Sequence, residues 1–234
     1  MSNYQRIHNS LDRLFSKSAR KKVQINDLRW VVFSDHHRGN RDEADDFEQC
    51  ESTYLKALEY YQQEQYGLLL LGDVDEFWEN NVWAPVKAYS EVLKSEARFY
   101  QRNQFIRIWG NHDDFWRTPF AFSQFLSKSF PSAKIMEQVC FEVMDGDQSI
   151  GEMLFVHGHQ GSKGSDRFAA LSRFIVRYVW RFFQKTFKFK LSTPRYDLGL
   201  RSVTDHALYN WAEKNKVALV CGHTHQPVFM SGSR

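Results

Sequence analysis

The sequence predicts an α/β domain, because short apolar runs typical of strands alternate with longer amphipathic stretches typical of helices. Five apolar runs end directly in Asp, Asn or His: residues 28–33, 67–71, 105–109, 217–221 and the run that precedes His157. The carboxyl ends of strands are where open α/β sheets bind their ligands. If these five ends converge, their polar side chains form a single pocket.

The size and composition of the chain suit one globular domain with a sizeable core. Of its 234 residues, 42% are hydrophobic and 25% are charged, which is ordinary for a soluble protein. Residues 28–234 would form this domain, after an N-terminal basic arm or helix over residues 1–27. The three cysteines lie far apart and predict no disulfide framework. With no apparent signal peptide or membrane-spanning run, we expect a reduced, cytoplasmic protein.

Between the strands, the sequence predicts helices and one hairpin. Apolar residues at helical spacings predict helices over residues 43–66 and 83–103. Asp145 and Gly146 predict a tight turn between two antiparallel strands. Four acidic residues are interpreted as the first turn of a helix, where they would complement the helix dipole: Asp42, Glu43, Asp45 and Asp46.

Seven side chains at the predicted strand ends are candidate metal ligands. They are Asp35, His37, Asp73, Asn111, His157, His223 and His225. All are imidazole, carboxylate or amide groups, which suit ions such as Mn, Fe or Zn better than Ca or a structural zinc held by cysteines. Seven ligands are too many for one tetrahedral ion, and they suit two ions that share a bridging carboxylate.

These residues resemble, in their order and spacing, the five motifs of the calcineurin-like metallophosphoesterases. The motifs are Asp35-His36-His37, Gly72-Asp73, Gly110-Asn111-His112-Asp113, His157 and Gly222-His223-Thr224-His225. The resemblance covers about residues 28–229. It implies a central two-sheet β sandwich flanked by helices. It also implies hydrolysis of a phosphate ester or pyrophosphate by water that two metal ions activate.

The same resemblance implies a role for each motif residue. It divides the seven ligands between two metals: Asp35, His37 and His225 for one, Asn111, His157 and His223 for the other, with Asp73 shared by both. His112 resembles the acid that protonates the leaving group, and Glu76 resembles the acid that orients it. Mn is the metal expected first, with Fe and Zn as alternatives.

Several neighbours of the ligands have more than one interpretation. His36 and His159 either contact the ligands or the substrate, or they belong to ordinary turns. Arg38 either binds a substrate phosphate or is a solvated surface side chain. A supporting role beside the metal ligands is also open for three acidic residues: Asp75, Asp113 and Asp114.

A basic and aromatic segment at about residues 164–200 separates His157 from the last strand. From Lys163 to Arg201 there are ten Lys or Arg against two Asp, although the formal charge of the whole chain is only +3. If the segment is helical, four basic residues form one stripe: Arg173, Arg177, Arg181 and Lys185. The stripe is either the solvated face of a packed helix, or part of a lid or membrane-surface element that binds phosphate or anionic headgroups.

A helical insertion at this place is similar to that of the UDP-2,3-diacylglucosamine pyrophosphatases, which cut a pyrophosphate while holding acyl chains. That subfamily usually has Arg where this chain has His112, and His-Gly-Asp where it has His157-Gly158-His159. We expect a lipid-linked or nucleotide-sugar substrate and peripheral contact with the inner face of a membrane. The candidate substrate contacts are Arg38, His159, Arg173 and Arg177.

Two other functions are weighed against this one. A nuclease or cyclic-nucleotide phosphodiesterase would use the basic segment, but that segment alternates Arg with bulky apolar residues instead of presenting a polar groove, which disfavours nucleic acid. A non-catalytic scaffold on the same fold would be expected to have lost ligands or the acid. All seven ligands and His112 are present in this chain.

Overall fold

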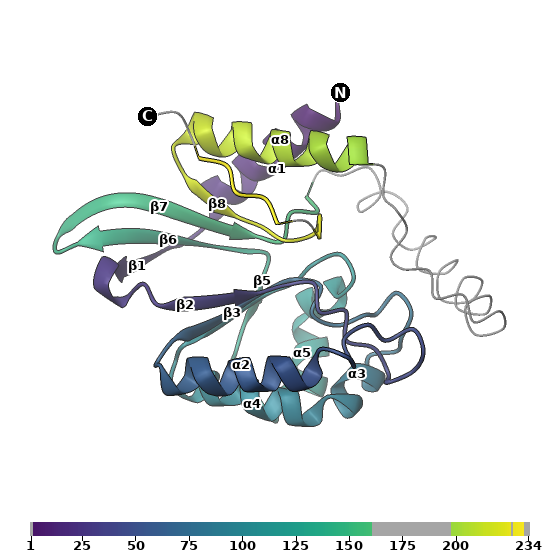
Figure 1. Cartoon of the computed structure of the whole chain (residues 1–234). Helices are drawn as coiled ribbons and strands as arrows, with labels where there is room; N and C mark the ends of the chain where they lie inside the picture. Colours follow the sequence, from purple (N-terminus) through teal and green to yellow (C-terminus); the bar gives the residue numbers. More distant parts are fainter. Residues whose placement is uncertain (1, 161–197, 226, 232–234) are drawn as a thin grey trace. The chain divides into compact units, whose positions relative to one another are not determined.

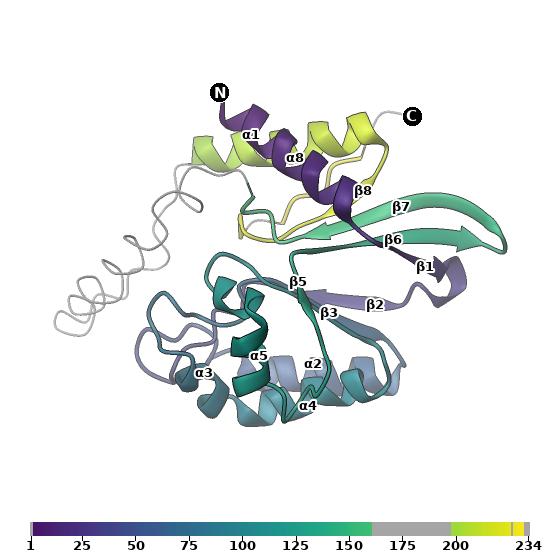
Figure 2. The ribbon, with the colours of Figure 1, turned by 180° about the vertical axis from the view of Figure 1, so that it is seen from behind.

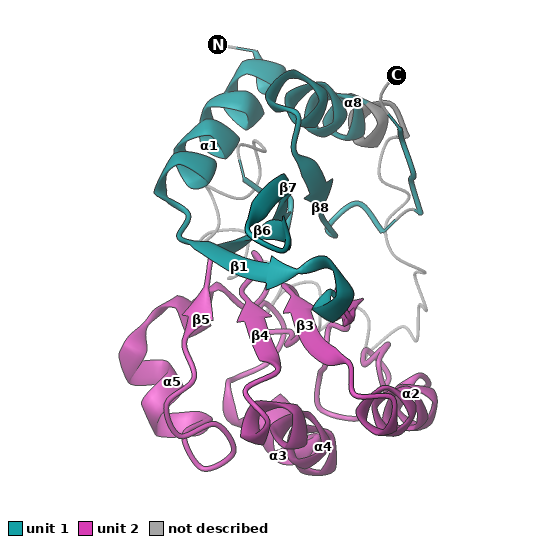
Figure 3. Ribbon diagram, turned by 90° about the vertical axis from the view of Figure 1, so that its left-hand side faces the viewer, with its two compact units in different colours: residues 1–28, 138–169, 191–234 teal, residues 29–137, 170–190 magenta. Residues whose placement is uncertain are grey.

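The computed structural model describes residues 2–160, 198–225 and 227–231. The chain divides into two compact units, which Figure 3 shows in different colours. Unit 1 comprises residues 1–28, 138–169 and 191–234, and unit 2 comprises residues 29–137 and 170–190. The predicted insert at about 164–200 lies outside the described residues, except for its last three positions, which begin helix α8.

Unit 1 contains a four-stranded sheet in the order β1-β6-β7-β8, with helices α1 and α8 packed beside each other on it (Figures 1 and 2). Its elements are α1 (Asn3–Lys17), β1 (Arg20–Gln24), the 3-10 helix η1 (Ile25–Asp27), β6 (Gln138–Asp145), β7 (Gln148–Val156), α8 (Leu198–Asn215) and β8 (Ala218–Val220). Strands β6 and β7 form the predicted antiparallel hairpin, and Gly146 supplies its turn with a φ of 59°.

The N-terminal helix is part of the core of unit 1. Ile7, Leu11 and Leu14 are at most 3% exposed and pack with Trp211 of α8. The indole N–H of Trp211 donates a hydrogen bond to Oδ1 of Asp12 (2.7 Å). Residues 1–27, which the sequence presents as an arm or helix, therefore supply a core helix and the edge strand β1, which pairs with β6.

Unit 2 contains a four-stranded parallel sheet in the order β2-β3-β4-β5. Its elements are β2 (Trp30–Phe33), α2 (Glu51–Gln63), β3 (Gly67–Leu71), α3 (Trp83–Ala88), α4 (Ser90–Gln101), β4 (Phe105–Ile108), the 3-10 helix η2 (Asp114–Arg117), α5 (Pro119–Phe125) and β5 (Ile135–Met136). Every residue of β3 is buried, as an unbroken apolar run predicts for a parallel strand. Leu58, Val92 and Phe99 pack α2 and α4 onto this sheet.

The two sheets of four strands and their flanking helices confirm the predicted fold class. Each of the five predicted apolar runs contains a strand, and each of these strands is followed by a predicted motif. Among the residues that the structure describes, no helix has both the length and the apolar character needed to cross a membrane.

Two helix predictions were wrong in their boundaries. The helix predicted over 43–66 begins only at Glu51, because Asp45 is buried and accepts hydrogen bonds from the backbone of Arg41 (2.7 Å) and the hydroxyl of Tyr89 (2.6 Å). Asp45 therefore organises a loop and does not lie in a first helical turn. The helix predicted over 83–103 is two helices, α3 and α4, which meet at the fully buried Tyr89.

Candidate metal centre

Three loops of unit 2 follow the carboxyl ends of β2, β3 and β4 and carry Asp35, His37, Asp73 and Asn111. The strands are parallel neighbours, so the loops emerge at one edge of the sheet. The backbone N–H of His37 donates to the carbonyl oxygen of Asp73 (2.9 Å), and that of His112 donates to Oδ1 of Asp73 (2.8 Å). The loops of this unit are therefore joined at Asp73.

The candidate ligands include five residues whose backbone lies in the left-handed region, which residues other than glycine rarely adopt. The φ angles are 55° for Asp35, 49° for His37 and 49° for Asp73 in unit 2, and 71° for His223 and 54° for His225 in unit 1. Such conformations cost about 1–3 kcal/mol each and persist where the surrounding structure enforces them. Their concentration at candidate ligands indicates that these loops are shaped to direct side chains.

The side chains of unit 2 offer metal-binding atoms to one another. His37 is hydrogen-bonded to Glu76 through Nδ1 (3.0 Å), and its Nε2 lies 3.9 Å from Oδ2 of Asp73. Two atoms bound to one ion by bonds of about 2.1 Å lie roughly 3–4 Å apart, so this separation suits shared ligation. Oδ1 of Asn111 is buried, and nothing in the described part of the chain donates a hydrogen bond to it. These donors fit a divalent metal ion.

Glu76 binds two histidines through one carboxylate oxygen. Its Oε2 lies 2.6 Å from Nδ1 of His112 and 3.0 Å from Nδ1 of His37. Burial raises the pKa of Glu76, but the charges and hydrogen bonds of the two histidines outweigh burial and lower that pKa to about 2. Burial lowers the pKa of His112, but the charges of Glu76 and Asp73 prevail and raise it. His112 is therefore favoured in its protonated form.

His37, Glu76 and His112 also lie close enough together to be considered as a metal-binding trio. Their contacts of 2.6 and 3.0 Å have the lengths of charge-assisted hydrogen bonds. Two atoms bound to one ion lie roughly 3–4 Å apart, so both contacts lie at or below the short end of that range. We therefore interpret these contacts as hydrogen bonds to Glu76 that orient the imidazoles of His37 and His112.

Unit 1 brings His157 and His223 together at the ends of β7 and β8. The two strands pair in parallel with Phe155 opposite Val220, so both loops emerge at the same edge. The N–H of Gly222 donates to the carbonyl oxygen of His157 (2.9 Å), and the centroids of the His157 and His223 rings are 5.2 Å apart. His157 is fully buried, so the polar imidazole lies within the protein at the position predicted for a ligand.

The remaining histidines of this region differ in exposure. His159 is 5% exposed, and its ring centroid is 5.4 Å from that of His157 and 6.3 Å from that of His223. It therefore belongs to the same cluster and not to an exposed turn. His225 is exposed at the end of the following loop.

Gly110 allows the third loop of unit 2 to approach Asp73. A Cβ atom at this position would lie 2.5 Å from the backbone nitrogen of Asp73, closer than real Cβ atoms approach a neighbour. The N–H of Gly110 donates to Oδ1 of Asp113 (2.6 Å). The first residue of the Gly110-Asn111-His112-Asp113 motif must therefore be glycine, because any Cβ atom would clash.

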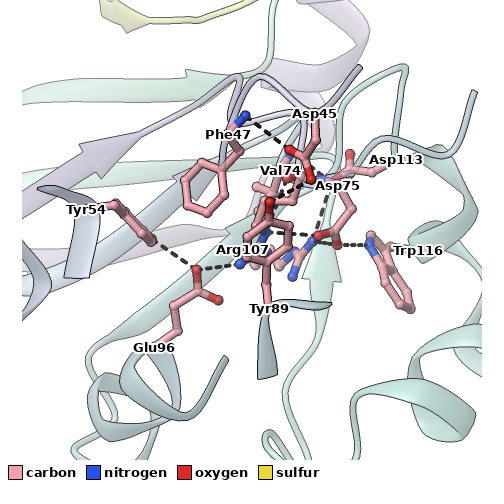
Figure 4. Close-up of polar contacts among 11 residues, drawn as sticks. Asp45, Phe47, Tyr54, Val74, Asp75, Tyr89, Glu96, Arg107, Asp113 and Trp116 are labelled. Carbon is pink, nitrogen blue, oxygen red and sulfur yellow. Dashed lines mark hydrogen bonds and ion pairs between the residues drawn. The ribbon is translucent and has the colours of Figure 1, made fainter. Parts of the chain in front are cut away.

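A buried network of charged side chains lies next to these loops (Figure 4). Arg38 donates through Nε to Oδ1 of Asp75 (3.0 Å) and through Nη1 to Oε1 of Glu96 (2.9 Å). Arg107 of β4 donates through Nη2 to the other oxygen of Asp75, Oδ2 (2.5 Å). All four residues are at most 3% exposed. Each oxygen of Asp75 therefore has its own guanidinium partner.

The network links the three ligand loops of unit 2. Arg38 directly follows His37, Asp75 follows Asp73 by two residues, and Asp113 follows Asn111 by two. Oδ2 of Asp113 lies 3.4 Å from Nη2 of Arg107 and accepts a hydrogen bond from the backbone N–H of Val74 (3.1 Å). One member of each loop is thus anchored in the same buried cluster.

The structure corrects the interpretation of Arg38. Both sequence-based alternatives, a substrate contact and a solvated side chain, require exposure, whereas Arg38 is fully buried. Asp75 and Asp113 are both buried in this network. Asp114 is partly buried and begins the 3-10 helix η2.

The other candidates are placed as follows. The ring of His36 lies among three aromatic rings, those of Phe33, Phe47 and Tyr54. Burial lowers the pKa of His36 to about 3, so its imidazole is neutral. Arg173 and Arg177 lie outside the described residues.

Sequence reasoning missed Arg107, Glu96 and Trp78. Arg107 is a charged residue within the apolar run Phe105–Ile108, and Glu96 is a buried position of α4. A charge inside an otherwise apolar strand is the signal that indicates a buried ion pair, because an unpaired charge would be costly there. Trp78 lies in the segment after Asp73 and donates through Nε1 to the carbonyl oxygen of Asn111 (2.7 Å).

Replacing Arg38 by Met tests the network. The change leaves Glu96 without its guanidinium partner and Asp75 with one guanidinium partner instead of two. We expect the free energy of unfolding to fall by about 3–5 kcal/mol, as when one partner of a buried pair is removed. Urea denaturation followed by tryptophan fluorescence measures this change.

The matched control is Arg41→Met, because Arg41 pairs with Glu51 (2.6 Å) near the surface. Exposed pairs contribute about 0–1 kcal/mol. A loss of stability in Arg38→Met no larger than that in Arg41→Met would contradict the role assigned to the buried network.

Comparison with known proteins agrees with this geometry. The family model described as calcineurin-like phosphoesterase matches residues 28–227. No curated protein matches the chain. The match spans both units and includes all seven candidate ligands together with His112. The chain therefore belongs to the calcineurin-like phosphoesterase family.

Proposed function

We propose that the chain uses two divalent metal ions, Mn in the first instance, to hydrolyse a phosphate ester or pyrophosphate. Family membership supports a metal-dependent phosphoesterase. The observation that carries the proposal is the group of ligands and acid at one sheet edge of unit 2: Asp35, His37, Asp73, Asn111 and His112. The family motifs imply that three residues of unit 1 complete the ligand set: His157, His223 and His225.

Bound metal ions would supply activated water near neutral pH and would stabilise the charge on the phosphoryl oxygens. The residues of the chain orient the groups that would bind the metal ions and transfer the proton. Oδ1 of Asp73 accepts a hydrogen bond from the N–H of His112, and Oδ2 of Asp73 lies 3.9 Å from Nε2 of His37. His112 is held at Nδ1 by Glu76 (2.6 Å), so Nε2 is the atom from which the departing oxygen would take a proton.

The metal requirement is tested at Asp73, the proposed bridging ligand. Wild-type protein is expected to contain about two metal ions per chain and to hydrolyse bis(p-nitrophenyl) phosphate with added Mn. Asp73→Ala should lose bound metal and lower activity more than about 100-fold, beyond the usual effect of changing a residue that only supports a ligand. Elemental analysis and a colorimetric assay measure the two effects.

Asp145→Ala is the matched control, because Asp145 is an exposed carboxylate at the β6–β7 turn. It should keep both metal and activity. Activity that survives chelation in the wild-type protein would refute the metal mechanism. Metal without turnover on any phosphoester would favour the scaffold alternative.

Metal binding should depend on pH through His37. Burial lowers the pKa of His37, but its hydrogen bond to Glu76 and the charges of Asp73, Glu76 and Asp35 outweigh burial and raise it to about 9. In the metal-free protein the imidazole is therefore protonated at pH 7 and must release a proton to become a ligand. Mn affinity should rise with pH below 9, by up to about tenfold per pH unit for one released proton.

Isothermal titration calorimetry in buffers of different ionisation enthalpy counts the protons released. A binding constant that stays the same from pH 6.5 to 8.5, with no proton released, would contradict the protonation state assigned to His37.

For the substrate, we propose a lipid-linked or nucleotide-sugar phosphoester or pyrophosphate, with contact to an anionic membrane surface. The basic and aromatic sequence of residues 164–200 supports this class, since Arg binds phosphate and aromatic residues accept apolar chains. Replacing both Arg173 and Arg177 by Gln should raise KM for an acylated nucleotide-sugar pyrophosphate about tenfold or more. The same change should leave KM for bis(p-nitrophenyl) phosphate almost unchanged.

The control replaces Lys56 and Lys214, two exposed residues of α2 and α8, by Gln. It removes the same charge from outside the segment. Equal losses on both substrates would refute a lipid-specific role. Turnover of cyclic nucleotides or single-stranded DNA in preference to the acylated substrate would favour the nuclease or phosphodiesterase alternative.

A further inference from the structure

The indole of Trp78 lies flat against the imidazole of His112. The ring centroids are 4.2 Å apart and the planes differ by 13°. The same indole donates through Nε1 to the carbonyl oxygen of Asn111 (2.7 Å). The backbone N–H of Trp78 donates to Oε1 of Glu76 (2.9 Å). One side chain thus contacts the ring of His112 and the backbone beside it, while its own backbone binds the carboxylate that holds His112.

The other contacts of His112 leave its imidazole ring free to tilt, and Trp78 can prevent this motion. Glu76 holds a single ring atom, Nδ1 (2.6 Å), and one hydrogen bond permits the ring to tilt about that contact. The ring of His37 meets His112 edge-on, with centroids 4.6 Å apart and planes at 90°. A flat contact with an indole resists tilting, because tilting would open a gap on one side and create a clash on the other.

We infer that Trp78 is a positioning residue for His112, which fixes the plane of the imidazole and thereby the direction of Nε2. The inference rests on the proposed function. In that reaction, the oxygen of water forms a bond to phosphorus, and the bond from phosphorus to the leaving oxygen breaks. The leaving oxygen keeps the electron pair and takes the proton from Nε2 of His112. The proton that the attacking water loses passes to solvent, and His112 regains a proton from solvent.

Proton transfer requires Nε2 within about 2.6–3.2 Å of the oxygen that accepts the proton. A misplacement of about 1 Å can lower the rate about 100-fold. Because Trp78 acts through the ring of another residue, its loss should affect only those reactions that need the proton. A tryptophan that merely filled space would affect every substrate alike.

The experiment compares two substrates that differ in leaving group. Nitrophenolate departs from bis(p-nitrophenyl) phosphate without a proton, whereas the phenolate of diphenyl phosphate needs more assistance. Trp78→Leu should lower kcat on diphenyl phosphate about tenfold or more, part of the 10²–10⁴-fold that acid catalysis contributes. It should change kcat on bis(p-nitrophenyl) phosphate less than about threefold, with metal content and KM unchanged.

Two further variants separate positioning from packing. Trp78→Phe lacks the N–H that binds Asn111 but retains an aromatic face that can stack on His112. It should therefore recover most of the kcat on diphenyl phosphate that Trp78→Leu loses. Trp83→Leu is the matched control, because Trp83 is 59% exposed and its ring contacts Phe125. It should behave as the wild type on both substrates.

A double-mutant cycle gives the decisive kinetic result. In a His112→Asn background, Trp78→Leu should cause no further loss on diphenyl phosphate, because the group that Trp78 orients is absent. Independent, multiplying losses would overturn the inference. Equal losses on the two substrates in Trp78→Leu alone would overturn it as well.

A spectroscopic measurement distinguishes failure of the inference from failure of the proposed function. In the wild type loaded with diamagnetic Zn, the stacked indole should shift the Cε1 proton of His112 upfield in the NMR spectrum. This shift should disappear in Trp78→Leu and persist in Trp83→Leu. A wild-type protein that hydrolyses neither substrate refutes the proposed function, whereas an unchanged His112 resonance in Trp78→Leu refutes the positioning of His112 by Trp78.

Discussion

The ligand loops of unit 2 depend on the buried ion pairs that Asp75 makes with Arg38 and Arg107. Taking three charges out of water is expensive, and the attraction between them offsets this cost only when the geometry is good. Here each oxygen of Asp75 faces a separate guanidinium, at 3.0 and 2.5 Å. Such a pairing can specify one arrangement where apolar contacts would tolerate several. We attribute to it the fixed register of the loops that carry the ligands.

This anchoring explains how strained backbone persists at the site. Asp35, His37 and Asp73 all have φ angles between 49° and 55°, which are unfavourable for residues that carry a Cβ atom. The cost is offset by hydrogen bonds between adjacent loops, such as those from the N–H of His37 to Asp73 and from the N–H of Arg38 to the carbonyl oxygen of Val74 (3.0 Å). Five of the nine non-glycine residues with positive φ in the described part of the chain are candidate ligands.

The sequence predicted the strands and their motifs because both are local. An apolar run such as Gly67–Leu71 and the Asp73 that follows it are visible within seven residues. The start of α2 was mispredicted because it depends on Asp45, whose hydroxyl partner Tyr89 is 44 residues away in the chain. The burial of Arg38 likewise depends on Glu96, 58 residues away. Pairings across such distances have no periodic signal in a single sequence.

The surroundings of His37 and His112 explain why two imidazoles on one carboxylate oxygen can have different roles. His37 places Nε2 3.9 Å from Oδ2 of Asp73, as a ligand would. His112 instead lies against Trp78. An imidazole can transfer a proton, whereas an Arg at this position could only stabilise charge. A leaving alkoxide needs that proton far more than a leaving phosphate does. Within the proposed substrate class, we therefore expect His112 to favour leaving groups that need protonation.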